Sequence, residues 1–197
     1  MHKFTVALDC DEVLNNLIEK TLELYNAQHG TQLALDSFTD YDFYKCLPFE
    51  DAEALTAMFL KKELWDSLSP APDSQWGVKK LIDSGYDVYV ATATHHTNFN
   101  WKIDWFMKNF PFIDEKRIIC IHNKSLLHVD VLVDDCAENL ISTNPLVDRV
   151  LLDRPWNHSI HDDAYGIYRV HNWEEIVAQV DAIYKDNQIL MHNLFYI

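Results

Sequence analysis

The chain has 197 residues, of which 48% are apolar and 13% aromatic, with only 4 glycines and 6 prolines. This composition excludes a disordered or low-complexity chain, and the length favours one folded domain with a modest insertion. The chain carries 31 acidic against 16 basic residues, a net charge of −15, which argues against polymeric nucleic acid as a partner, because binding to a phosphate backbone requires a cationic surface.

The cysteines and the hydropathy pattern indicate a cytoplasmic protein. No apolar stretch approaches the roughly 20 residues that a membrane span needs, and the apolar run near the first residue is too short for a signal peptide. The four cysteines show no CxxC pair and no zinc spacing; they are Cys10, Cys46, Cys120 and Cys136. We therefore expect free thiols, a cytoplasmic location and no membrane association.

The first predicted strand covers residues 4–8 (FTVAL), a short apolar run that ends at acidic residues. Apolar residues at helical spacing follow as far as Gly30, and residues 49–62 (FEDAEALTAMFLKK) predict a second helix. Between these helices lies an aromatic, acidic stretch, DSFTDYDFYKC. Because residues 15–71 contain no predicted strand, we interpret them as a helical insertion that covers the functional site.

From residue 70 onward, predicted helices and strands alternate. Asp73 is expected to cap a helix that runs through Ile82 and stops at Gly85, and a strand follows at 87–92 (DVYVAT). The later strands are expected at 117–121, 129–133, 149–152 and 167–170, with helices at 98–109 and 173–184.

Six short apolar strands separated by helices predict the α/β class. The specific prediction is a Rossmann-like, doubly wound parallel sheet, whose ligands bind beyond the carboxyl ends of the strands. The predicted core domain comprises residues 1–14 and 72–197, and the predicted helical cap comprises residues 15–71.

Polar residues follow four of the predicted strands, where they are expected to meet at one edge of the sheet. They are Asp9, Asp11, Thr92, Lys124, Asp134 and Asp135. Crowded carboxylates repel one another, and a divalent cation removes that cost. Hard oxygen ligands suit Mg²⁺, so we expect Mg²⁺ as the cofactor. A lone DxD would indicate only a solvated turn between strand and helix; the whole set is what favours a catalytic site.

The order of these motifs resembles the haloacid dehalogenase superfamily of phosphohydrolases. An apolar strand precedes DxD, a second strand precedes Thr92, and Lys124 lies ten residues before the Asp134–Asp135 pair. A receiver domain uses similar residues, but there the lysine follows every acidic residue, which excludes it here. The resemblance covers residues 4–153 and implies hydrolysis through an aspartyl-phosphate.

The resemblance also implies a role for each of these residues. Asp9 is the expected nucleophile, and Asp11 the acid that protonates the leaving alcohol and then the base that activates water. Thr92 is expected to bind a phosphoryl oxygen, and Lys124 to hold the nucleophile and the phosphate together. The expected metal site comprises the Asp9 carboxylate, the Asp11 backbone carbonyl and Asp135, with Asp134 in its outer shell.

Within the superfamily, the chain resembles the 5′(3′)-deoxyribonucleotidases and their bacterial and phage relatives. Three features carry this resemblance: the short chain, the helical insertion directly after DCDEVL, and the segment DRPWN at 153–157. Two features depart from the usual pattern, Glu12 where glycine is common and Ala93–Thr94 where Ser-Pro follows the motif threonine in the animal enzymes. Both departures concern substrate range more than chemistry.

The expected partner is a small phosphorylated substrate, a nucleoside monophosphate. Aromatic side chains of the insertion can stack on a nucleobase, and we select Phe43 and Tyr44 from among them, although packing of the insertion onto the core is the alternative for any single ring. The other expected substrate-binding residues are Thr92, Ala93, Thr94 and His95.

Several alternatives stay open at this point. One is a phosphatase of another small phosphomonoester, such as a sugar phosphate, and another is a catalytically silent binding module, although no motif residue is missing. A dehalogenase is disfavoured by Asp11, because displacement of a halide needs no acid. The apolar residues of the C-terminal segment DNQILMHNLFYI either pack on the core or form a homodimer contact.

Overall fold

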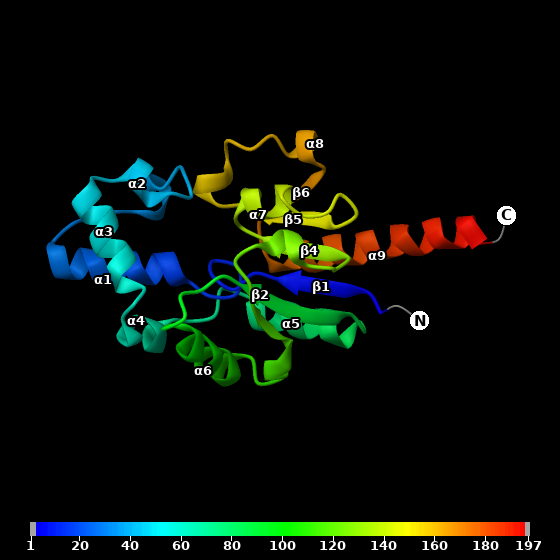
Figure 1. Ribbon diagram of the computed structural model, residues 1–197, viewed down its shortest axis with the longest axis horizontal. Helices are drawn as coiled ribbons and strands as arrows, with labels where there is room; N and C mark the ends of the chain where they lie inside the picture. The colour runs from blue at the N-terminus through cyan, green and yellow to red at the C-terminus, as the bar shows by residue number, and fades with distance from the viewer. Residues whose placement is uncertain (1–2, 196–197) are drawn as a thin grey trace.

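The computed structural model describes residues 3–195, and for residues 191–195 it describes only their place in the last helix. Six strands alternate with helices along the chain (Figure 1). The strands are β1 (Thr5–Leu8), β2 (Asp87–Thr92), β3 (Ile118–Cys120), β4 (Val131–Asp134), β5 (Asp148–Leu152) and β6 (Ile167–Val170). The α-helices are α1 (Leu17–His29), α2 (Phe43–Cys46), α3 (Phe49–Met58), α4 (Lys62–Ser67), α5 (Ser74–Asp83), α6 (Phe99–Asn109), α7 (Ala137–Ile141), α8 (Asp162–Tyr165) and α9 (Trp173–Phe195). Short 3-10 helices lie at η1 (Leu35–Ser37), η2 (Glu115–Arg117), η3 (Lys124–Leu126) and η4 (Pro155–Asn157).

The strands form one parallel sheet in the order β3-β2-β1-β4-β5-β6. This arrangement confirms the predicted α/β, Rossmann-like fold. The strand order changes direction between β1 and β4, which pair in register from Val6 with Val131 to Leu8 with Val133. In open α/β sheets a crevice opens at this reversal, beyond the carboxyl ends of the two strands. The fold therefore places the residues that follow β1 and β4 at the natural binding position.

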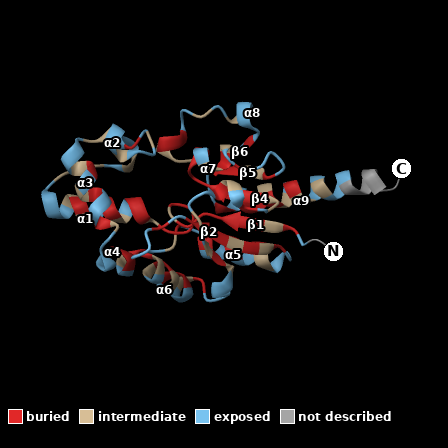
Figure 2. Cartoon of the chain, in the orientation of Figure 1, coloured by how far each residue is buried: buried red, intermediate tan, exposed pale blue. Residues whose placement is uncertain are grey.

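Alternate residues of the strands pack on opposite faces of the sheet, as the two-residue period of a strand requires. In β1, Val6 and Leu8 join the larger hydrophobic cluster, whereas Ala7 joins the smaller one. Helices α5 and α9 contact each other, and α9 contacts β5 and β6, while α7 contacts β4 and β5. Both faces of the central strands are therefore buried (Figure 2), which explains why these strands are almost continuously apolar.

The elements α1, η1, α2, α3 and α4 all lie between β1 and α5 in the chain. They gather beyond the carboxyl end of β1, at the left of Figure 1. Helix α1 packs against α3 and α4, and α4 packs against α6. The larger hydrophobic cluster includes Tyr25, Leu55 and Trp65 of this segment together with core residues such as Val90, so one continuous apolar interior joins the segment to the sheet.

The structure departs from the sequence-based expectations at three helices, in the bounds of two and in the capping of the third. The helix expected at 49–62 ends at Met58, and α4 begins at Lys62, because the amides of residues 59–61 bond three residues back and tighten the last turn. Asp73 lies at the N-terminus of α5 with a φ of 59° and makes no side-chain cap, so its predicted capping role is wrong. Helix α9 continues to Phe195, eleven residues beyond its predicted end.

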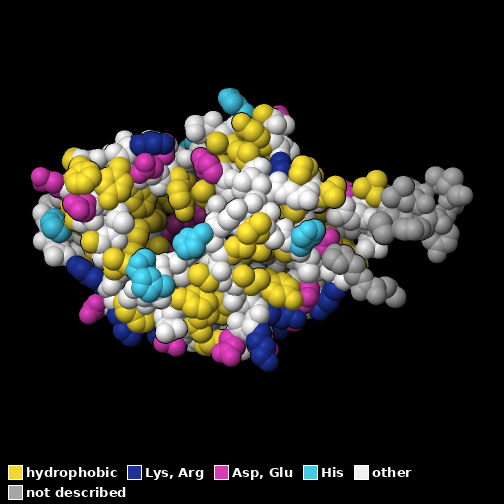
Figure 3. Space-filling model, viewed as in Figure 1, with side chains coloured by type: hydrophobic (Ala, Val, Ile, Leu, Met, Phe, Trp, Pro, Cys, Tyr) yellow, Lys and Arg dark blue, Asp and Glu magenta, His cyan; other side chains and the backbone are white. Residues whose placement is uncertain are grey.

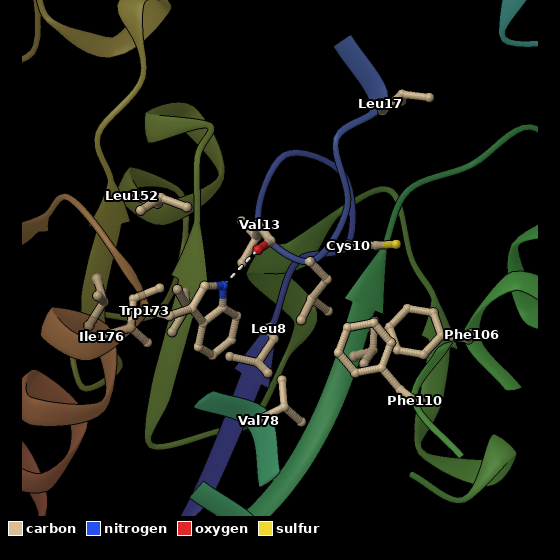
Figure 4. Close-up of a cluster of buried hydrophobic side chains, with 14 of the residues drawn as sticks. Leu8, Cys10, Val13, Leu17, Val78, Phe106, Phe110, Leu152, Trp173 and Ile176 are labelled. Carbon is tan, nitrogen blue, oxygen red and sulfur yellow. Dashed lines mark hydrogen bonds between the residues drawn. The ribbon is translucent and has the colours of Figure 1, made fainter. Parts of the chain in front are cut away.

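Helix α9 also anchors the turn that follows β1. The Trp173 indole donates a hydrogen bond of 3.0 Å to the Val13 carbonyl (Figure 4). A Cβ atom at Gly77 in α5 would lie 2.1 Å from the Trp173 ring, so glycine is what allows α5 and α9 to approach this closely.

The sequence also predicts free thiols, a C-terminal contact and the absence of a membrane span. None of the helices within the described residues is both long and apolar enough to span a bilayer. All four cysteines are free thiols. The side chains of residues 191–197 lie outside the described residues, so the homodimer contact expected there stays a prediction.

Candidate active site

The turn after β1 carries Asp9 and Asp11 and is held in an unusual conformation. Glu12 has a φ of 59°, a left-handed conformation that costs a non-glycine residue roughly 1–2 kcal/mol. Its carboxylate accepts a hydrogen bond of 2.6 Å from the Ile18 amide, so it caps the start of α1. Burial raises the pKa of Glu12 to about 7, against the effects of the Ile18 amide and Arg154. The residue that replaces the family's usual glycine is therefore a structural cap.

Three carboxylates meet beyond β1 and β4. Each of Asp9, Asp134 and Asp135 is buried, and each offers an oxygen within 4.8 Å of the others. Asp9 directly follows β1, and its amide donates a hydrogen bond of 2.9 Å to the Val133 carbonyl of β4. The reversal of strand order thus brings Asp9 close to two acids that follow it by 125 and 126 residues in the chain.

Lys124, at the start of η3, lies between two of these carboxylates. Its Nζ donates to Asp9 Oδ1 at 2.5 Å and to Asp134 Oδ2 at 2.6 Å. Burial by itself would lower the pKa of Lys124, but the Asp9 and Asp134 carboxylates raise it above its usual value. The lysine therefore stays charged, and it balances one of the three buried negative charges.

The negative charge that Lys124 does not balance affects the pKa values of Asp9 and Asp135, the two carboxyl groups that face the crevice. Burial raises the pKa of Asp9 to about 6, although Lys124 opposes this shift. Burial, followed by the charges of Asp134 and Asp9, also raises the pKa of Asp135. Both groups would ionise more readily beside an additional cation.

The donor set fits a hard divalent cation. Mg²⁺ binds oxygen ligands at about 2.0–2.1 Å, so two of its ligands lie at most about 4.2 Å apart; these carboxylate oxygens lie within 4.8 Å of one another, so a small adjustment of their side chains would bring them to one ion. Asp134 is already engaged by Lys124, by Asn139 at 3.1 Å and by the Cys136 amide at 2.9 Å. Asp9 and Asp135 are the carboxylates best placed to hold the ion.

Asp11 belongs to a second group of polar residues. Its carboxylate accepts hydrogen bonds from Lys102 Nζ at 2.7 Å and from Asn15 Nδ2 at 2.9 Å. Among the described residues its carboxylate does not join the cluster of Asp9, Asp134 and Asp135, and the assignment of its backbone carbonyl to the metal stays a prediction. Lys102 also donates to Thr92 Oγ1 at 2.8 Å. Thr92 is fully buried, so its bond to a phosphoryl oxygen stays a prediction.

Lys102 is the main site residue that the sequence analysis missed. It lies on α6 in FNWKIDWFMKN and is fully buried, with its ammonium group 5.0 Å from the centre of the Trp65 ring. Burial would lower the pKa of Lys102, but the Asp11 carboxylate raises it. The available signal was a lysine on the helix that follows the motif threonine, which the sequence alone does not distinguish from a solvated one.

A cavity of about 850 Å³ opens above the carboxylates. It lies between the sheet and the helical segment, which is the part of the chain formed by α1, η1, α2, α3 and α4. The face in Figure 3 is hollowed there, with acidic side chains visible inside the hollow. The sheet side of the cavity includes Asp9, Asp11, Ala93, Thr94, His95, Lys124 and Asp135. The side formed by the helical segment is mostly apolar, with Leu17, Ile18, Tyr41, Phe43, Tyr44, Ala57, Phe59, Leu60 and Trp65, and it also includes Asp42, Glu53 and Thr56. Five of the six predicted substrate-binding residues line the cavity, and Thr92 lies beneath it.

The aromatic residues of the cavity differ in how they are held. Phe43 packs edge-on against Phe38, with ring centres 4.9 Å apart, whereas Tyr44 is half exposed and contacts Phe49. Tyr41, which was not selected from the sequence, also lines the cavity. Desolvation, followed by the charge of Asp135, raises the pKa of the Tyr41 hydroxyl.

A hydrogen bond from Asn98 ties the helical segment to the loop that follows β2, beside this cavity. The Phe59 carbonyl, in the turn between α3 and α4, accepts from Trp65 Nε1 and from Asn98 Nδ2, both at 2.8 Å. Asn98 precedes α6 in the loop that also carries His95. The end of α3 is therefore fixed relative to the loop that follows β2.

Comparison with known proteins gives a consistent result. The model of one family, described as 5′ nucleotidase, deoxy (pyrimidine), cytosolic type C protein, matches residues 3–185. A 5′(3′)-deoxyribonucleotidase of Clostridium acetobutylicum is 27% identical over 93% of this chain and 98% of its own length. One from Bacillus subtilis is 29% identical over 88% of this chain and 96% of its own length.

Solved structures agree on the fold. A haloacid dehalogenase-like hydrolase from Streptococcus pneumoniae superposes with a TM-score of 0.62 at 12% identity, over 90% of this chain and 98% of its own. A hydrolase of the same superfamily from Deinococcus radiodurans, determined with bound phosphate and sodium, gives a TM-score of 0.58 at 14% identity, over 92% and 96%.

Proposed function

The chain belongs to the 5′ nucleotidase, deoxy (pyrimidine), cytosolic type C family, and from this membership we propose that it hydrolyses (deoxy)nucleoside monophosphates with the help of Mg²⁺, through an aspartyl-phosphate. As a member of this family it is a phosphomonoester hydrolase of the 5′-nucleotidase type. One observation supports the finer proposal most strongly. Asp9, Lys124 and Asp135 lie on the sheet side of a cavity whose opposite side is largely apolar and aromatic.

In the first half of the proposed reaction, an oxygen of the Asp9 carboxylate attacks phosphorus. The bond from phosphorus to the ester oxygen breaks, and the leaving alkoxide takes a proton from Asp11. The product alcohol is a nucleoside, and the phosphoryl group remains on Asp9 as a mixed anhydride. Lys102 and Asn15 orient the Asp11 carboxyl, since they hold one oxygen each.

In the second half, Asp11 takes a proton from water, and the water oxygen attacks phosphorus. The bond between phosphorus and Asp9 breaks, which releases inorganic phosphate and restores the carboxylate. Lys124 stays charged throughout and stabilises both the Asp9 carboxylate and the negative charge on the phosphoryl oxygens. Asp9 and Asp135 would hold Mg²⁺, and the ion would neutralise phosphate charge.

The proposed substrate class rests on the cavity. A phosphate group is stabilised by the positive charge of Lys124, which lines the cavity on its sheet side. A nucleobase instead gains free energy from contact with flat apolar rings. A sugar phosphate presents hydroxyl groups instead, and these require polar partners, of which this mostly apolar lining supplies few. We propose that residues 15–71 act as a cap that provides this lining.

A panel of phosphomonoesters tests the proposed function. Purified protein is assayed for phosphate release from 5′- and 3′-deoxynucleoside and ribonucleoside monophosphates, sugar phosphates and O-phosphoserine, each with Mg²⁺ or EDTA. Nucleotides are expected to give the highest kcat/KM, and EDTA to abolish turnover. Comparable efficiency on sugar phosphates would remove the nucleotidase assignment, and full activity in EDTA would remove the metal.

Alanine substitution of the cavity aromatics tests base stacking. Phe43→Ala and Tyr44→Ala are expected to raise KM for nucleotides by the equivalent of roughly 1–3 kcal/mol while sparing p-nitrophenyl phosphate, which has no nucleobase. Phe49→Ala is a matched control, because Phe49 is exposed and contacts Tyr44 from outside the lining. Equal loss on both substrates would mean that these rings only hold the helical segment together.

Removing the Lys102 charge tests the role of Asp11. Lys102→Met is expected to lower kcat on nucleotides by about 10- to 100-fold, because Asp11 loses the partner that orients it. The loss on p-nitrophenyl phosphate should be smaller, since p-nitrophenolate leaves with little help from an acid. Lys108→Met, at an exposed position of the same helix, is the control. A Lys102→Met protein with the wild-type kcat on nucleotides would refute this role of Lys102.

A further inference from the structure

Two consecutive residues of η4 hold Asp135 from both its side chain and its main chain. The Trp156 indole N–H donates to Asp135 Oδ2 at 3.0 Å. The Asn157 amide group donates to the Asp135 carbonyl at 2.9 Å and to the Leu152 carbonyl at 2.9 Å. All of these groups are buried. The segment DRPWN, which supplied only a family resemblance in the sequence, therefore contacts the acidic cluster directly.

An ionic network fixes η4 from the side away from the cluster. Asn157 Oδ1 accepts from Arg169 Nη1 at 2.6 Å. Arg169 in turn forms a two-pronged ion pair with Asp162, at 2.7 and 2.8 Å, and a further bond of 2.7 Å to Asp153. Ion pairs of this bidentate geometry restrict both partners. The position of Trp156 is therefore set by a chain of contacts that extends to β6 and α8.

The carboxylates of the neighbouring residues Asp134 and Asp135 differ in the charge of the group that donates to them. Asp134 is paired with the charged Lys124, at 2.6 Å. Among the described residues, the donor to the Asp135 carboxylate is the neutral Trp156 indole. A neutral donor orients a carboxylate without supplying a positive charge of its own, so the Trp156 indole leaves the Asp135 carboxylate available to a cation.

We propose that Trp156 is a positioning residue for the divalent cation. Its indole fixes Asp135 Oδ2 and so sets the orientation of the carboxylate that would bind the ion. This inference rests on the metal site of the proposed function. Partners that orient metal ligands typically contribute 10- to 100-fold to metal affinity, and the same range is expected here.

Titration calorimetry with Mg²⁺ alone tests this proposal on the purified full-length protein. Trp156→Phe keeps most of the ring and removes the N–H donor, and it is expected to raise the Kd for Mg²⁺ by about 10- to 100-fold. Trp105→Phe is the matched control: its buried indole donates to the Leu68 carbonyl at 3.1 Å, and Trp105 does not line the cavity. Its Kd should stay within about twofold of the wild-type value.

The outcomes separate this inference from the proposed function. A wild-type protein that binds no Mg²⁺ would overturn the metal site itself. A wild-type protein that binds Mg²⁺, with Trp156→Phe binding equally well or with both variants weakened alike, would overturn only the role of Trp156. Thermal unfolding without metal is recorded for both variants, since a merely structural role would lower Tm and leave the Kd unchanged.

A second measurement uses the wild-type protein and does not depend on how the variant folds. In an assigned ¹H–¹⁵N spectrum, Mg²⁺ is expected to shift the indole signal of Trp156, because the acceptor of its hydrogen bond becomes a metal ligand, and to leave that of Trp105 in place. A Trp156 signal that does not move at saturating Mg²⁺ would overturn the proposal.

Discussion

Asp9→Asn is expected to abolish phosphatase activity, with a loss of more than about 10⁴-fold in kcat. An amide is a poor nucleophile toward phosphorus, and it offers no negative charge to a cation. The substitution preserves the size of the side chain, and Lys124 keeps its bond to Asp134, so the fold should persist. Phosphate release from the best nucleotide, measured at saturating Mg²⁺, provides the test.

Asp73→Asn is the control for this substitution. Asp73 is exposed and has a φ of 59°, a conformation that asparagine also tolerates. The control should therefore retain wild-type activity and Tm. Turnover by Asp9→Asn within about tenfold of the wild-type rate would refute the assignment of Asp9 as nucleophile.

Lys124→Met is expected to damage both activity and stability. The substitution leaves Asp9 and Asp134 without their shared cation inside the protein, and breaking a buried ion pair in this way costs about 3–5 kcal/mol in the free energy of unfolding. It also removes the charge that holds down the pKa of Asp9, so that more of the nucleophile is protonated near neutral pH. With the lost stabilisation of phosphoryl charge, kcat should fall by at least about 10³-fold.

Denaturant unfolding and steady-state kinetics measure these two effects separately. Lys79→Met is the matched control, because Lys79 forms an exposed ion pair with Asp83 one helical turn away, and such pairs contribute less than about 1 kcal/mol. A Lys124→Met protein as stable as this control would contradict the buried network, and one with nearly full activity would contradict the role of Lys124 in charge stabilisation.

The fold class could be predicted from the sequence because its signals are local. Strand β2 was predicted at its observed bounds, since its apolar run is bounded by Gly85 and by the loop that begins at Ala93. The residues after β1 and β4 could also be assigned to one site, because parallel strands place their carboxyl ends at the same edge of a sheet. The structure brings Asp9, Lys124, Asp134 and Asp135 together there.

The contacts that orient these residues were not predictable, because each depends on tertiary packing. Lys102 reaches Asp11 and Thr92 only because α6 turns one face into the interior. Trp156 meets Asp135 because β5 lies beside β4 in the sheet. The end of α3 at Met58 was not predictable either, because the residues that follow it are good helix formers.

Chemical capture of the covalent intermediate tests directly whether Asp9 is the nucleophile that carries the phosphoryl group. The wild-type protein is mixed with its best nucleotide and Mg²⁺, quenched in acid during turnover and treated with borohydride, which reduces an aspartyl-phosphate to homoserine with loss of the phosphoryl group as inorganic phosphate. Peptide mass spectrometry is expected to find homoserine at position 9 and aspartate at positions 11, 134 and 135. Homoserine at another of these positions would contradict the assignment of Asp9 as nucleophile. The absence of homoserine at position 9 in a protein that is turning over substrate would contradict hydrolysis through an aspartyl-phosphate on Asp9.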